Sequence, residues 1–319
     1  MSVNNFITAF DHNREMLFHQ SPQWLNPFRK EGYNHFCKIG LPDRSNEEWK
    51  YTSVEMLSQI PYSLSSQVSN ESLGSISNYI QSDIVIVFVN GRYSQALSSF
   101  NEMNSLYHLK AFSSMSEQDC LMPSLYSTAT KTDFFVSLHK AFVTDGVYLH
   151  ISDKAVISNP IHILHINTND NSQLPLMHHP HVYIYGGMHS KFSIIETYHS
   201  IHSKNSFVNS LCECIVDENA HVSHYLMFNE DMQTAHIHNS YVVQKKNSSY
   251  HSLIFSLSSK LLRNALSVQL AQAGASVSLD GLYLIHKNHH SDNHTIISHQ
   301  KSDTSSNQVY KGILNDHAR

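Results

Sequence analysis

Clustered positive charge, long apolar runs and a leader-like start are all missing from this sequence of 319 residues. Lys and Arg total 21 against 26 Asp and Glu, which gives a formal net charge of −5 with His neutral. Nucleic-acid binding draws on clustered cations, so no nucleic-acid partner is expected. The longest apolar run, Ile84 to Val89, has six residues, whereas a membrane helix needs about 20. Polar and charged residues occupy the start, where a signal peptide is apolar, so we expect neither a membrane span nor a secretory signal.

Cysteine is also scarce, and familiar catalytic motifs are missing. The four Cys, at positions 37, 120, 212 and 214, form no CxxC pair and are too few for a disulfide framework. We therefore expect a reducing compartment, the cytoplasm. The sequence has no nucleophile elbow, phosphate-binding glycine loop, HExxH motif or dinucleotide fingerprint, which counts against an enzyme.

The first 140 residues predict helices joined by loops. Asn26-Pro27 is a good helix start, and Gly40 with Pro42 is a good helix end. Ser45 to Glu48 has the spacing of a capping box and opens a short helical or turn segment through Trp49, Lys50 and Tyr51. The remaining expectations are a first helix carrying Phe6, Phe10 and Leu17, a loop over 61–83, a strand over 84–89 ended by Asn90-Gly91, and a helix over 132–142.

After Gly146 the sequence alternates with a period of two, in segments that begin about 10 to 16 residues apart. Tight hairpin dipeptides are missing between these segments, because Asp280-Gly281 falls inside one of them, and the chain has only ten Gly. Charged residues make up 15% of the chain, against about 25% in a typical soluble domain, and Ser, Asn and 25 His take their place. Regular strands without hairpin turns favour a parallel β-helix, with a jelly roll as the alternative.

Histidine and cysteine supply the candidate chemistry. On a strand, Asp292, His294 and Ile296 share one face, with Asn293 and His299 on the other. Asp292 and His294 could therefore ligate a divalent metal with a third ligand from a neighbouring coil, as a hydrolase or lyase would require; the alternative is a hydrogen-bonded polar ladder. The pairs His236/His238 and His221/His224 are weaker candidates of the same kind.

Cys212 and Cys214 lie on one strand face, about 6–7 Å apart along the strand, with side chains that run parallel. They could hold a soft metal or accept sulfur, or they could pack as small hydrophobic residues. Two thiolates do not make up the four ligands that a cluster normally needs, so we expect no cofactor bound by this chain alone. A partner could complete such a site.

Several short motifs in order resemble the SufB/SufD family of iron–sulfur cluster assembly proteins, in its SufD branch. These motifs are Gly40-Leu41-Pro42, Asn46 to Thr52 with Trp49, Lys50 and Tyr51, Val89 to Tyr93, Arg263 to Leu266, Gly274-Ala275, Asp280 to Leu284, Asp292-Asn293-His294-Thr295, and Gln308 to Leu314 with Tyr310, Lys311 and Gly312.

The resemblance implies a right-handed parallel β-helix over residues 141–319, preceded by a helical or mixed region over 1–140. It also implies a non-catalytic scaffold that pairs with a SufB-like subunit through the β-helix and works with a SufC-like ATPase. Iron or an iron–sulfur cluster would then be held only transiently, within the complex, and the protein would support iron acquisition.

Family members continue past the Tyr310-Lys311-Gly312 element with more β-helix, a Cys-Ser-His-Gly element and a helical region that recruits SufC. This sequence stops at Arg319, so those elements have no counterpart in it, and His294 does not take over the role of the missing histidine. An uncovered last coil exposes a strand edge, so we expect a homo- or heterodimer formed through the β-helix.

Overall fold

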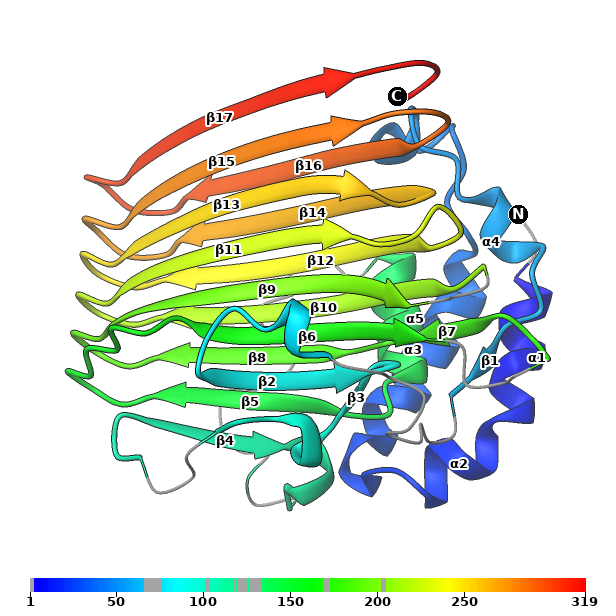
Figure 1. Cartoon of the computed structure of the whole chain (residues 1–319), viewed down its shortest axis with the longest axis horizontal. Coiled ribbons are helices and arrows are strands. Elements are labelled where there is room, and N and C mark those ends of the chain that lie inside the picture. Colours follow the sequence, from blue (N-terminus) through cyan, green and yellow to red (C-terminus); the bar gives the residue numbers. More distant parts are fainter. Residues whose placement is uncertain are drawn as a thin grey trace.

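Two long sheets of mainly parallel strands lie face to face, and a group of helices packs against the outer face of one sheet (Figure 1). This computed structural model describes residues 3–65, 76–100, 104–116, 119, 126, 133–168, 173–201 and 205–319. The predicted loop over 61–83 falls partly outside these residues, and so does Cys120.

The helices cluster at the N-terminal end of the chain. They are α1 (Asn4–His12), α2 (Arg14–His19), η1 (Gln23–Leu25), α3 (Asn26–Ile39), η2 (Glu47–Trp49), α4 (Glu55–Ser58), η4 (Ile76–Tyr79), η5 (Gln95–Leu97), η6 (Phe112–Ser114) and α5 (Phe134–Phe142). Among the described residues, none of these helices has the length and apolar character that a membrane crossing needs.

The helix boundaries follow the predicted signals, with one correction. Pro27 lies in the first turn of α3, and Gly40 caps its end with φ +70°. The capping box at Ser45 is wrong, because Ser45 instead bonds to Asp43 through its backbone N–H (2.8 Å) and its hydroxyl (2.5 Å). Asn46 is the cap of η2, and its side chain accepts a hydrogen bond from the Glu48 N–H (3.1 Å).

From β8 onward, strands of the two sheets alternate along the chain. Sheet A contains β1 (Ser63–Leu64), β4 (Tyr107–Ala111), β5 (Gly146–Ile151), β7 (Leu176–His178), β8 (His181–Gly186), β10 (Phe207–Val216), β12 (Ala235–Gln244), β14 (Leu261–Leu270) and β16 (His290–His299). Sheet B contains β2 (Ile84–Val89), β3 (Arg92–Tyr93), β6 (Ile161–Thr168), β9 (Lys191–Ile201), β11 (His221–Asn229), β13 (Ser249–Ser258), β15 (Ser276–Ile285) and β17 (Ser305–Leu314).

Each strand from β8 onward pairs in parallel with the neighbouring strands of its own sheet, one coil away along the chain. The prediction of a parallel β-helix is thus confirmed, and the jelly roll is wrong. In the described part of the chain, antiparallel pairing joins only β2 to β3 and β4 to β5 among the named strands. Both β2 and β4 precede residue 140, so the N-terminal region adds strands to the two sheets.

The coils turn at single residues in the left-handed conformation. Asn219 (φ 57°), Asn247 (φ 53°) and Gly274 (φ 76°) occupy equivalent corners of successive coils. Asn and Gly tolerate this conformation, and a Cβ at position 274 would collide with the Asn247 side chain. One residue per corner is sufficient, which explains why hairpin dipeptides are missing from the sequence.

Alternation along the strands creates two cores. Residues that point between the sheets form the solenoid interior, which includes Ile184, Phe192, Cys212 and Val268. The outer face of sheet A is buried under α1, α3 and α5, where Phe207 and Ile237 meet helix residues. Both faces of β10 are therefore covered, and this strand carries the two cysteines.

Candidate functional site

A carboxylate lies fully buried between the two sheets. Glu196 of β9 points inward on the same strand face as Ile194 and Tyr198. Its Oε1 accepts hydrogen bonds from Tyr198 Oη (2.6 Å) and His165 Nε2 (3.1 Å), and its Oε2 accepts one from His224 Nε2 (3.0 Å). Burial alone would raise the pKa of Glu196, but the hydrogen bonds from both imidazoles outweigh it and leave the pKa well below its usual value. Glu196 is therefore ionised in the interior.

Parallel register brings the two histidines to this carboxylate. β6, β9 and β11 are adjacent in sheet B, and Glu196 is paired with Ile163 on one side and Leu226 on the other. His165 and His224 each lie two residues from these partners, so their side chains share the inward face with Glu196.

Cys212 of β10 faces this group from sheet A. The donor atoms offered by Glu196, Cys212 and His224 all lie within 4.8 Å of one another, and all three residues are buried. Burial raises the pKa of the Cys212 thiol well above its usual value, so the side chain is a neutral thiol here. Such a trio of carboxylate, thiol and imidazole is a potential ligand set for a metal ion.

A second chain of polar groups continues inside the solenoid. Glu230 accepts hydrogen bonds from Asn167 Nδ2 (2.9 Å) and His236 Nδ1 (2.8 Å). His236 Nε2 and His238 Nδ1 both contact Ser210 Oγ, each at 2.7 Å, and all of these side chains are buried. This chain lies near the Glu196 group, because the Tyr198 ring packs against both His236 and His238.

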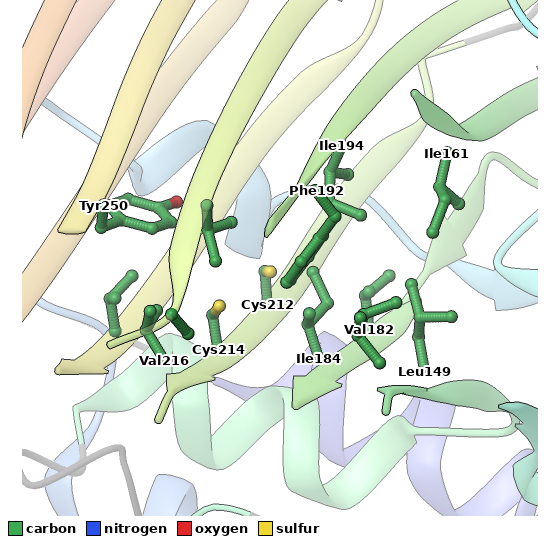
Figure 2. Close-up of a cluster of buried hydrophobic side chains, with 14 of the residues drawn as sticks. Leu149, Ile161, Val182, Ile184, Phe192, Ile194, Cys212, Cys214, Val216 and Tyr250 are labelled. Atoms are coloured by element: carbon green, nitrogen blue, oxygen red, sulfur yellow. The ribbon is translucent and has the colours of Figure 1, made fainter. Parts of the chain in front are cut away.

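Cys214 lies in different surroundings. It points inward on the same face as Cys212, as predicted, but Figure 2 shows it among apolar side chains such as Val216 and Ile184. Burial raises the pKa of Cys214 to about 12. Cys214 therefore packs as a small hydrophobic residue, and Cys212 is the cysteine that meets polar partners.

Asp292 is occupied by structural partners. It forms an ion pair with Arg263 on the adjacent strand and accepts a hydrogen bond from Thr52 Oγ1 (2.5 Å). The Arg263 guanidinium lies 4.1 Å from the centroid of the Trp49 ring. Asp292 therefore ties the segment that carries Trp49 to the solenoid, which gives two of the family signature residues a structural role.

The expected faces of β16 are observed. Asp292 and His294 are opposite Arg263 and Ala265 of β14, on the outer face of sheet A. Asp292 lines an open hollow of about 670 Å³, whereas His294 lines a separate small hollow beside Arg263 and Tyr241. Within the described residues, the trio that could hold a metal ion does not include Asp292 or His294. The other residues that line the large hollow include Lys50, Tyr51, Asn293 and Tyr310.

Two further signature residues, Tyr310 and Gly312, belong to glycine–tyrosine pairs that join β15 to β17. Gly281 of β15 is opposite Tyr310 of β17, and Tyr283 is opposite Gly312. A Cβ at either glycine would collide with the facing ring. The glycines of these two strands therefore make room for the facing tyrosine rings.

Sequence reasoning missed most of the interior site. The sequence did not point to Glu196, His165 or Glu230, and His224 was only a weaker candidate, in a pair with His221. The available signal was a charged residue at an inward position of an alternating strand, since Glu196 has the parity of Phe192 and Ile194. A fully buried Glu needs partners, which is a reason to look for histidines on the neighbouring strands.

The fold places this protein in the class of parallel β-solenoids, in which stacked coils form an extended molecule. Here, helices cover one side of the solenoid. Comparison with family models narrows the class. Residues 165–319 match the SufBD core domain of the SUF system for FeS cluster assembly, and residues 1–163 match the SufBD protein N-terminal region. The chain belongs to the SufBD family.

Curated relatives have low identity over most of the chain. An iron–sulfur cluster assembly SufBD family protein of Synechocystis is 23% identical over 293 residues, which is 88% of this chain and 64% of the relative. The iron–sulfur cluster assembly protein SufD of Escherichia coli is 24% identical over 309 residues, 93% of this chain and 70% of the relative. The chloroplastic protein ABCI7 of Arabidopsis thaliana is 20% identical over 281 residues, 86% and 58% respectively.

The chain thus spans about three fifths to seven tenths of the length of these relatives. The SufBD family comprises scaffold-type components of iron–sulfur cluster assembly and not catalytic enzymes. The contacts of Asp292 and His294 give no support to the hydrolase or lyase interpretation, because Asp292 is paired with Arg263 and the two residues line separate hollows.

Proposed function

We propose that this protein is a SufD-like, non-catalytic scaffold subunit of a cytoplasmic SUF complex that assembles iron–sulfur clusters. The observation that carries the proposal is the match of two SufBD family models across residues 1–163 and 165–319. Iron and the nascent cluster are cargo in this role, held within the complex, and the subunit supports iron acquisition.

The proposed partners are a SufB-like subunit, which pairs through the β-helix, and a SufC-like ATPase. Support for these partners comes from the similarity to the iron–sulfur cluster assembly protein SufD of Escherichia coli over 93% of the chain.

Co-purification tests the proposal. The chain is co-expressed with the SufB-like and SufC-like proteins of its own organism, and a tag on this chain is used for capture. We expect the SufB-like subunit to co-elute in a fixed ratio, alone or together with the ATPase. Failure of this chain to associate with either protein would refute the scaffold role.

A further inference from the structure

The trio of Glu196, Cys212 and His224 has the composition and closeness of a three-ligand metal site. From the three donors within 4.8 Å of one another, we propose that the solenoid interior binds one borderline divalent cation such as Zn²⁺ or Fe²⁺. One thiolate, one imidazole and one carboxylate suit cations of this class. Such a site depends on these donor atoms alone and not on the scaffold role.

The three donor atoms are nearly as close together as they would be around a bound metal ion. Metal–ligand distances of about 2.0–2.3 Å place donors on one tetrahedral ion about 3.3–3.8 Å apart. Closing the group from its present spacing therefore takes side-chain shifts of about an ångström. The three donors come from three strands, β9, β10 and β11, so both sheets contribute to the site.

A surrounding shell already orients two of the three ligands. Tyr198 Oη and His165 Nε2 hold Glu196 Oε1, which leaves Oε2 directed toward His224. The other ring nitrogen of His224, Nδ1, lies 2.9 Å from Tyr250 Oη. When Nε2 binds a metal ion, Nδ1–H can donate to this hydroxyl oxygen, which is the arrangement that fixes a ligating imidazole.

Charge balance favours a divalent ion in this interior. The carboxylate of Glu196 and the thiolate of Cys212 together carry two negative charges, and a divalent cation neutralises both. A neutral set is far less costly to bury than an unpaired charge. To bind, Cys212 releases its thiol proton, and the proton that His224 now carries on Nε2 moves to Nδ1, so that the imidazole stays neutral.

The proposal departs from the expectation that this chain alone binds no metal. That expectation considered Cys212 together with Cys214, whereas the structure combines Cys212 with Glu196 and His224 instead. Because the group is enclosed between the sheets, we expect the ion to enter while the chain folds.

The test is refolding of the full chain with Co²⁺, without oxygen, in a background where Cys37 and Cys120 are replaced by Ser. Unbound Co²⁺ is removed with a weak chelator. We expect one Co²⁺ per chain and a thiolate-to-cobalt charge-transfer band in the near ultraviolet. Cys212→Ser should lose the band and at least about ten-fold in retained Co²⁺.

Cys214→Ser is the matched control, since Cys214 lies two residues along the same strand face among apolar side chains. It should retain both the ion and the band. His224→Gln, which leaves every remaining thiol in place, should lose the ion, and this variant decides the matter if Cys212→Ser does not refold. The proposal is overturned if the parent chain retains no Co²⁺, or if Cys212→Ser or His224→Gln retains as much as the parent.

Discussion

Two buried charged residues of the solenoid, Glu196 and Arg263, have charged or titratable partners on neighbouring coils. Arg263 is nearly buried, with its side chain 4% exposed, and it depends on Asp292 one coil further along. The same residue stacks on Trp49 from a segment over two hundred positions earlier. Replacing Asp292 should therefore weaken the contact between the N-terminal region and the solenoid.

Replacing Asp292 by Ala should lower the free energy of unfolding by about 3 kcal/mol, because Arg263 then stays buried without its counter-charge. Urea unfolding measures the change, and a red shift of the tryptophan fluorescence, to which Trp49 contributes together with Trp24, reports the loosened contact. Asp83→Ala removes an exposed carboxylate and should leave both unchanged. Equal stability of the Asp292 variant would contradict the structural role of this ion pair.

His162 makes the stability of the fold depend on pH. It is buried in β6, with Nε2 2.8 Å from Thr197 Oγ1, while Nδ1 accepts a hydrogen bond from the Gln81 N–H. Burial lowers the pKa of His162 to about 4, whereas an unfolded histidine titrates near about 6.5. The unfolded chain therefore binds one more proton than the folded chain between these values, and stability falls as the pH drops from 6.5 to 4.

We expect this one histidine to contribute a slope of up to about 1.4 kcal/mol per pH unit. His162→Asn keeps an acceptor near Gln81 but cannot titrate. Urea midpoints measured from pH 7 to pH 4.5 should fall less steeply for this variant than for the parent chain. Parallel curves would mean that His162 does not titrate as described.

At the scale of strands, the sequence was most informative where only one face of a strand is apolar. The period of two predicted after Gly146 is matched by alternating burial in β9, β11 and β13. In β6, all eight residues are buried, and β10 and β12 are buried on both faces as well, so burial does not alternate along these strands. The interior site could not be predicted, because Glu196, Cys212 and His224 meet only through the register and the facing of two sheets.

In the glycine–tyrosine pairs of β15 and β17, replacing each glycine by alanine should change the stability of the fold by a different amount. At Gly281 a Cβ would meet Tyr310 near the base of its ring, whereas at Gly312 it would meet the outer end of Tyr283. Gly281→Ala should therefore destabilise by about 1–3 kcal/mol. Gly312→Ala should be close to neutral, since Tyr283 can swing aside and Ala restricts the unfolded chain. Thermal unfolding of both variants checks this order, and a reversed order would contradict the packing.

For the molecule as a whole, the regular length of a coil limits how such a protein can become longer or shorter. β11, β13, β15 and β17 begin at residues 221, 249, 276 and 305, so one coil takes 27 to 29 residues. Loss of one residue inside β13 would turn every later side chain of that strand to the opposite face. Loss of an entire coil would instead join β11 to β15 with inward and outward positions preserved. Insertions and deletions among proteins of this architecture should therefore come in steps of one coil, with smaller changes confined to the corners.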